Sequence, residues 1–211
     1  MKQYFEIVDV SARKVMDLAL NPTVEVEVTL DDGTVGRASA PSGMQNAKDV
    51  SIAVDNVNME IAEALIAMNA LEQVALDALM LEIDMAEDAS RLGANAVLAA
   101  SLACVKAAAA SSGLSLYNYI GGVNARAIPK VVKEGDAVCL SSYATLSRFM
   151  EAVSARRAEG KKLIISAGSG ETEDSVLADI AVALNADGII TSSSAVINQL
   201  MRIEEELYDM Q

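Results

Sequence analysis

The sequence has no histidine and no tryptophan, and its 211 residues include only two cysteines, five tyrosines and two phenylalanines. Without histidine, the chain has no imidazole that could act as a base near neutral pH. The cysteines, Cys104 and Cys139, lack the spacing of a disulfide framework or a metal site, so we expect free thiols in a reducing compartment. With 52% hydrophobic residues but few aromatic ones, the core must be built mainly from Ala, Leu, Val, Ile and Met.

Basic residues are also scarce, because 16 Lys and Arg stand against 30 Asp and Glu, for a formal net charge of −14. Nucleic acids and anionic membrane surfaces are bound through basic patches, so we expect neither as a partner. Residues 1–7 lack the apolar core of a signal peptide, and the uncharged run 92–105 is too short and too polar to span a bilayer. We therefore expect a cytoplasmic protein whose partner is another protein.

The first forty residues carry the pattern of strands. Residues 24–30 alternate strictly between apolar and polar side chains, and residues 4–10 and 34–38 alternate less regularly. Asp31-Asp32-Gly33 provides a tight turn between the second and third of these segments. The pattern predicts a three-stranded antiparallel meander.

From Val50 to about Ala110 the hydrophobic period becomes helical. The segment 94–110 is so rich in alanine that it is small on nearly every face, which favours a helix buried between neighbours. The stripes of the two preceding helices are Val54, Val57, Ile61, Leu65 and Met68, and then Leu71, Val74, Ala75, Ala78 and Leu79. Both stripes are expected to face the core.

The segment 163–174 reads as a buried strand followed by a glycine loop and the start of a helix. Gly168 and Gly170 permit a sharp turn, and the acidic residues of 171–174 are expected in the first helical turn, where the helix dipole favours negative charge. An apolar stripe over 176–184 continues the helix. Parallel α/β folds bind ligands at such loops, where free backbone N–H groups can hold an anion.

Several motifs occur here in the order and spacing of the enolase family. They are Asn21-Pro-Thr-Val-Glu-Val-Glu-Val28, Val54-Asp-Asn-Val-Asn58, Leu116-Tyr-Asn-Tyr-Ile-Gly-Gly-Val-Asn124 and Ser169-Gly-Glu-Thr-Glu-Asp174. The chain thus resembles enolases, and the resemblance implies an α+β fold with an enolase N-terminal-like domain over 1–128. A complete (β/α)8 barrel needs about 250 residues, far more than follow residue 128. Most of the barrel is therefore expected to be missing, and 129–136 is expected to be a linker. Residues 137–211 are expected to form a remnant with the last two βα units and the C-terminal helix.

Enolases convert 2-phosphoglycerate with a lysine base and Mg²⁺, and the resemblance implies that these groups are missing here. Cys139 stands at the position of the base and Ile190 at that of the lysine that holds the substrate carboxylate. Ala167 and Gly168 replace a histidine and an arginine. The barrel strands that supply the metal ligands are absent as well, and the loop that follows Pro41 has lost the serine that closes over the metal. We therefore expect no catalytic residues, no metal site and no cofactor.

What the resemblance retains is a vestigial substrate site and half of a subunit contact. Ser42 and Ser169 occupy substrate-binding positions, although an N-cap beside an acidic turn is the favoured interpretation of Ser169. In the family, the residues at Glu25 and Arg202 pair across a dimer, so these two are candidate interface residues. The alternative is that both are solvated surface charges, because exposed ion pairs contribute little.

The favoured interpretation is a catalytically inactive enolase homologue that acts as a structural or regulatory subunit, with a protein partner or a second copy of itself. The alternatives are residual phosphopyruvate hydratase-like binding of a phosphorylated metabolite with Mg²⁺, or a new activity with Cys139 as a nucleophile near Ser169. A sheet of two parallel strands would expose apolar surface that needs a cover. That surface is expected at Val131, Val132, Val138, Leu140, Ile164 and Ile165.

Overall fold

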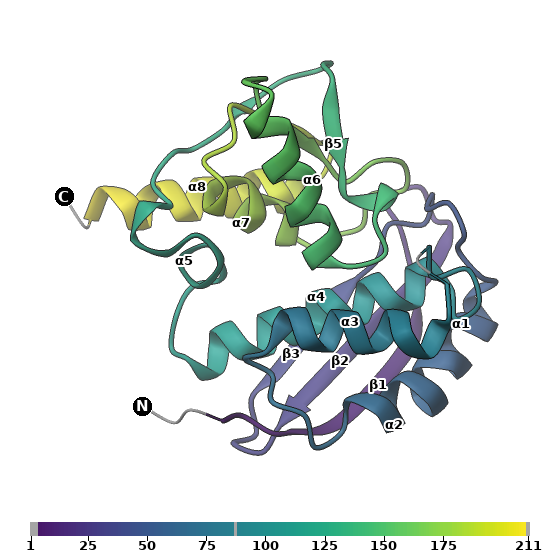
Figure 1. Ribbon diagram of the computed structural model, residues 1–211. Coiled ribbons are helices and arrows are strands. Elements are labelled where there is room, and N and C mark those ends of the chain that lie inside the picture. The colour runs from purple at the N-terminus through teal and green to yellow at the C-terminus, as the bar shows by residue number, and fades with distance from the viewer. Residues whose placement is uncertain (1–3, 87, 210–211) are drawn as a thin grey trace.

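The computed structural model describes residues 4–86 and 88–209, which form two lobes (Figure 1). The N-terminal lobe, residues 4–111, has an antiparallel sheet with helices on one face. The C-terminal lobe, residues 116–209, has a parallel sheet with three longer helices packed around it. The fold is therefore α+β, as predicted.

The sheet of the N-terminal lobe is an antiparallel meander of β1 (Ile7–Met16), β2 (Pro22–Leu30) and β3 (Val35–Ser39). The predicted alternation in β2 is confirmed, since its valines are buried and Glu25 and Glu27 lie on the other face. The first strand was placed too early, because β1 begins at Ile7 and runs to Met16. Its second half was missed since Arg13 and Lys14 blur the alternation on an exposed strand.

Helices cover the inner face of this sheet. They are α1 (Val50–Asn56), a π-helical segment (Val57–Ile61), α2 (Ala62–Leu65), α3 (Gln73–Asp84) and α4 (Ala94–Ser111). Helix α4 lies directly on the sheet, and a Cβ atom at Gly36 of β3 would be 2.2 Å from the Ala103 carbonyl oxygen. The alanine-rich sequence thus buries α4 as predicted. Its length and composition would also suit a membrane span, but most of it is buried, as in the core helix of a soluble protein.

Helix α3 turns a different face to the core from the one that its sequence suggested. Leu76 and Met80 are fully buried, whereas Val74, Ala75 and Ala78, predicted to face the core, are exposed. The helix has apolar residues on two faces, and hydrophobic periodicity alone does not say which face meets the sheet.

The C-terminal lobe begins with α5 (Leu116–Gly121) and a short 3-10 turn (Gly122–Asn124). Its strands are β4 (Lys130–Val131), β5 (Ala137–Cys139), β6 (Ile164–Ser166) and β7 (Gly188–Ile190). Its helices are α6 (Leu146–Ala158), α7 (Val176–Ala183) and α8 (Ser194–Asp209), with a 3-10 turn at Leu140–Ser142.

The four short strands form one parallel sheet in the order β4-β7-β6-β5. The sheet is larger than predicted, because the segment 129–136, expected to be a linker, contributes β4, which pairs with β7. The predicted apolar surface is mostly covered within the chain: Val138, Leu140 and Ile165 are buried, while Val131 is 55% exposed. These strands do not close a barrel of eight.

The first turn of α6 is held by the other lobe. The backbone N–H of Leu146 donates to the Ser101 hydroxyl of α4 at 3.0 Å, and that of Ser147 donates to the Asp77 carboxylate of α3 at 2.9 Å. The first N–H groups of a helix have no partner within the helix, so these side chains satisfy groups that burial would otherwise leave unpaired. Burial raises the pKa of Asp77 although hydrogen bonds from Ser147 and Ser101 oppose it.

A second buried carboxylate lies in α7, which packs against α5 and α8. Asp179 accepts weak hydrogen bonds from the Gln199 amide of α8, at 3.3 and 3.4 Å. Burial raises the pKa of Asp179 to about 6, and the hydrogen bond from Gln199 and the charge of Lys106 offset only part of this effect. Close packing continues at α5, where a Cβ atom at Gly121 would be 2.3 Å from the Ala183 carbonyl oxygen.

Candidate functional site

The carboxyl ends of β5, β6 and β7 lie at one edge of the parallel sheet, where open α/β sheets bind ligands. The loop after β6 turns sharply at Gly168, whose φ is +89°, and the backbone N–H of Ser141 donates to the Ala167 carbonyl at 3.0 Å. A Cβ atom at Gly168 would be 1.9 Å from the Ser141 hydroxyl oxygen. Glycine therefore lets the two loops meet.

A loop of the N-terminal lobe packs on this edge and brings the two predicted substrate-binding serines into adjacent loops. The N–H groups of Ser42 and Gly43 donate to the carbonyls of Gly170 and Ser169, at 3.0 and 3.2 Å. A Cβ atom at Gly170 would be 2.1 Å from the Ser42 hydroxyl oxygen. Ser42 is half-buried and Ser169 is exposed. The two loops are thus joined backbone to backbone.

The partly open cavity beside these loops is small. Its volume is about 20 Å³, and it is lined by Pro41, Leu140, Ala167, Glu171 and Val196, among others. Ligand-binding pockets usually have roughly 300–1,000 Å³. The cavity at the strand ends has the size of about one water molecule, so it has no room for a phosphorylated metabolite.

Asp17 ties the β1–β2 turn to the same loops. Its carboxylate accepts hydrogen bonds from the Ser42 hydroxyl at 2.6 Å, from the backbone N–H groups of Ala19 and Asn21, and from the Asn21 side chain. Burial acts to raise the pKa of Asp17, but these hydrogen bonds outweigh it and hold the pKa below its ordinary value. The turn places Leu20 at a positive φ of 65°, which L residues rarely adopt.

The acidic residues of 171–174 do not form the first turn of α7, as their sequence had suggested. The helix begins at Val176, so these residues precede it, and Ser169 is not its N-cap. Asp174 still meets the helix, because it accepts from the Val176 N–H at 2.9 Å. The segment is irregular rather than helical, because long-range contacts hold its side chains, and local sequence does not report such contacts.

Three partners in these contacts were not predicted: Lys106, Ser39 and Ser192. Lys106 of α4 donates to Asp174 at 2.6 Å, and the Ser39 N–H donates to the same carboxylate at 3.0 Å. The N–H and hydroxyl of Ser192 donate to one oxygen of Glu171, each at 2.7 Å. Lys106 stands alone among the alanines of α4, and that isolated charge was the one available signal.

The carboxylates of this site do not fit a magnesium ion. Asp174 is paired with Lys106, and one oxygen of Glu171 is held by Ser192, while the other, Oε1, is buried without a hydrogen-bond partner. Mg²⁺ needs about six oxygen ligands in an octahedron, and the small cavity beside Glu171 does not provide them. Within residues 4–86 and 88–209, no group of three or more acidic, cysteine or histidine side chains is placed to bind a metal.

The candidate interface residues lie on separate elements. Glu25 projects from the exposed face of the antiparallel sheet and pairs with Arg13 at 3.0 Å and Arg37 at 3.8 Å. Arg202 is exposed on α8 and donates to the Gln199 side chain at 3.4 Å. Pairing of Glu25 with Arg202 of a second copy stays a prediction.

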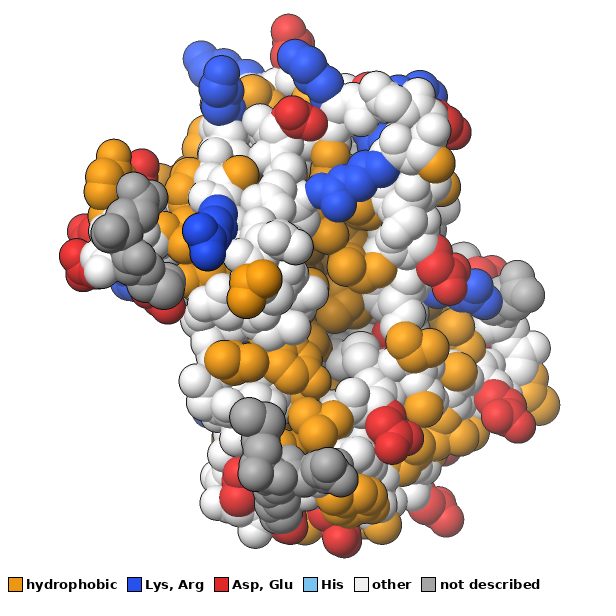
Figure 2. Space-filling view, turned by 60° about the vertical axis from the view of Figure 1, so that its left-hand side comes forward, with side chains coloured by type: hydrophobic (Ala, Val, Ile, Leu, Met, Phe, Trp, Pro, Cys, Tyr) orange, Lys and Arg blue, Asp and Glu red, His pale blue; other side chains and the backbone are white. Residues whose placement is uncertain are grey.

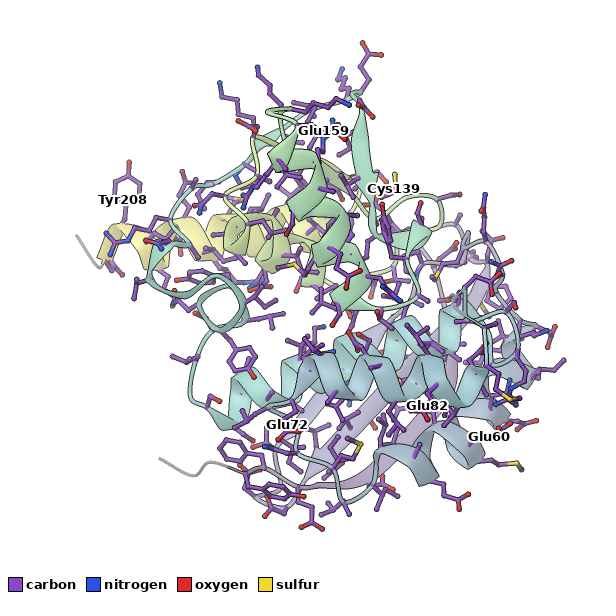
Figure 3. The ribbon with its side chains drawn as sticks, in the orientation of Figure 1. Glu60, Glu72, Glu82, Cys139, Glu159 and Tyr208 are labelled. Carbon is purple, nitrogen blue, oxygen red and sulfur yellow. The ribbon has the colours of Figure 1, made fainter. Side chains whose placement is uncertain are left out.

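Both cysteines are free thiols. Cys104 is buried in α4, and burial raises the pKa of its thiol. Cys139 is half-buried at the end of β5 (Figure 3), where its thiol lies 3.9 Å from the Ala137 carbonyl oxygen of the same strand. The contact does not activate a thiol, because nucleophilic cysteines need a base or a positive charge that stabilises the thiolate.

A larger open cavity of about 590 Å³ lies beside the joined loops. Its lining includes Met44, Asp88, Tyr143, Arg148 and Glu151. Arg148 forms an ion pair with Glu151 at 3.0 Å. With Asp88 and Glu151 near its one arginine, this cavity does not favour an anion.

Comparison with protein families agrees with this architecture. The enolase N-terminal domain matches residues 7–120, more than half of the chain, and the enolase C-terminal TIM barrel domain matches residues 123–211. The first match contains the meander and α1 to α4, and the second contains the parallel sheet. The chain therefore belongs to the enolase family, as a shortened member.

Proposed function

We propose that this protein is a non-catalytic member of the enolase family that acts through association with other proteins, as a structural or regulatory subunit in the cytoplasm. The observation that carries the proposal is the joint between the loops of Ser42 and Ser169. In an enzyme these loops would surround a substrate, whereas here they bond to each other over a cavity of about 20 Å³.

The side chains around this joint support the same proposal. The Ser42 hydroxyl donates a hydrogen bond to Asp17, and the Lys106 ammonium is paired with Asp174. Cys139 stands where the resemblance places the catalytic base. Proton abstraction and charge stabilisation each contribute several kcal/mol to typical enzymes, about 3–5 for a positioned base, so losing them together leaves no route to the family reaction.

Calorimetric titration with 2-phosphoglycerate and Mg²⁺, combined with an assay for phosphoenolpyruvate, tests the loss of activity. We expect neither saturable heat nor turnover above the buffer rate, while a complete enolase in the same buffer gives both. Saturable binding or measurable turnover by the shortened chain would contradict the proposal.

Light scattering after size-exclusion chromatography tests self-association through Glu25 and Arg202. If the chain is a dimer held by this pair, Glu25→Arg and Arg202→Glu each shift the mass towards a monomer, and the double variant restores the dimer. Glu25→Arg alone also gathers three arginines on one sheet face, so the restoring double variant is the necessary control. A dimer of unchanged mass in both single variants rejects the pair as the contact.

A further inference from the structure

Helix α3 has an apolar face that the described chain leaves largely exposed at Val74 and Ala78. One face is buried through Leu76 and Met80, and the opposite face carries Val74, which is 73% exposed, together with exposed Ala78 and half-buried Leu81. The spacing of Val74, Ala78 and Leu81 is the i, i+4, i+7 spacing by which one helix packs on another. A helix that is apolar on both faces is typical of a helix buried on both sides.

The exposed face borders an apolar groove between the lobes. The groove has a volume of about 590 Å³, and its apolar lining consists of Val74, Val105, Tyr119, Ile120, Leu146 and Met150. These residues come from α3, α4, α5 and α6, so helices form both the walls and the floor. Figure 2 shows hydrophobic side chains gathered in a hollow between the two lobes.

The one charged residue among the described residues that line this groove is acidic. It is Glu151, whose ion-pair partner Arg148 lies outside the lining, and none of the lining residues is lysine or arginine. Helix α3 likewise has no basic residue, and Glu72 and Glu82 lie towards its two ends (Figure 3). A second copy of a chain with a net charge of −14 would bring like charge to this surface, whereas a basic partner would be attracted.

We propose that the groove between α3 and α6 binds an amphipathic helix of a partner protein, with apolar residues at i, i+3 or i+4, and i+7 and with lysine or arginine on its flanks. The inference rests on the proposed function, because it names the class of partner for that association. Apolar side chains of the bound helix would enter the groove, and its basic residues would approach Glu72, Glu82 and Glu151.

Fluorescence anisotropy with two synthetic peptides tests the inference on the intact chain. Both are helices of about 18 residues with leucine at the spacing above, one with lysine and one with glutamate at the flanking positions. We expect the leucine–lysine peptide to bind with a micromolar dissociation constant, and more weakly when salt is raised from about 0.05 to 0.3 M. No binding of this peptide, or equal binding of the glutamate peptide, would overturn the inference.

A matched pair of double variants separates docking in the groove from attraction to an acidic surface. Val74→Gln with Met150→Gln keeps the net charge, and we expect it to weaken binding at least about tenfold. Val35→Gln with Met59→Gln changes the same residue types at exposed sites elsewhere, and binding should be unchanged. Full affinity in the groove variant would overturn the inference, as would a dimer that only this variant dissociates.

The same samples, assayed with 2-phosphoglycerate, keep this inference distinct from the proposed function. A failed peptide experiment without turnover removes the helix partner and leaves a non-catalytic subunit. Turnover of phosphoglycerate removes the proposed function whatever the peptide does.

Discussion

The two lobes differ in how far each supports its own fold. In the N-terminal lobe, β1 and β2 have 10 and 9 residues, and α4 is buried along most of its length, packed on β2 and β3. In the C-terminal lobe the strands have two or three residues, and α6 begins on side chains of α3 and α4. The comparison suggests that a barrel fragment persists because a complete neighbouring domain replaces the contacts of the missing strands.

The two lobes are expected to differ most in how their stability responds to a methyl group added at a close backbone contact. Gly36→Ala would place a Cβ 2.2 Å from the backbone of α4, and Gly121→Ala would place one 2.3 Å from the backbone of α7. Gly36→Ala should cost about 4 kcal/mol and unfold both lobes, because overpacking against backbone cannot relax easily. Gly121→Ala should loosen the C-terminal lobe alone.

Hydrogen exchange measured by mass spectrometry distinguishes these outcomes. In Gly121→Ala the amides of β1 to β3 should stay protected while those of β6 and α7 exchange. If Gly36→Ala left the C-terminal lobe protected after the meander had opened, the proposed dependence of one lobe on the other would be wrong.

The contact between the lobes at α6 can be tested at Asp77. Asp77→Ala leaves the Ser147 N–H without its acceptor in a buried place, which should lower the free energy of unfolding by about 2–3 kcal/mol. Asp77→Asn keeps an oxygen acceptor and removes a carboxylate whose pKa is raised by burial, so it should lie within about 1 kcal/mol of the parent. Urea titration at neutral pH measures both, and equal stabilities for the two variants would exclude the capping role.

Asp179 should make the C-terminal lobe less stable at higher pH. Burial raises its pKa to about 6 in the folded state, from an ordinary value of 3.8. Stability therefore falls as pH rises from about 4 to about 6, and the full cost, about 3 kcal/mol, is present above that range. Asp179→Asn does not titrate, so its advantage over the parent should grow with pH and level off above about pH 6.

Thermal denaturation of both proteins between about pH 4 and pH 8 measures this difference. The change of stability with pH is caused by Asp179 only if the asparagine variant does not show it. An advantage that is the same at every pH would show that Asp179 titrates normally.

The smallest expected effect lies at the turn that joins the lobes near Ser42. Leu20 has φ +65°, a conformation that costs L residues about 1 kcal/mol. Leu20→Gly should therefore stabilise the protein slightly, by about 0.5–1 kcal/mol. Leu18→Gly, at a position without positive φ, should destabilise it, and the two variants together measure the strain of the turn.

Local signals in the sequence predicted much of the fold. The meander follows from the alternation of β2 and the turn at Gly33, and the burial of α4 follows from its alanine-rich sequence. The exposed face of α3, the start of α7 and the strand β4 could not be predicted locally. Each depends on a distant partner: α4 for the buried face of α3, Lys106 for Asp174, and β7 for Val131.

The candidate site shows the same limit. The resemblance placed Ser42 and Ser169 together, but the hydrogen bond from Ser42 to Asp17 joins residues far apart in the sequence and has no local pattern. The size of the cavity depends on backbone contacts at Gly43 and Gly170, and only the structure shows these. The groove beside α3 was hidden because Val74 and Ala78 were assigned to the core.

The two-residue strand β4 affects how one edge of the open parallel sheet can pair with other molecules. An open parallel sheet ends in unpaired backbone groups that invite strands of other molecules. Here the outer strand is only Lys130–Val131, it follows Pro129, and a second lysine, Lys133, comes soon after it. So short and charged a strand offers little backbone for a strand of another molecule to pair with at this edge of the sheet.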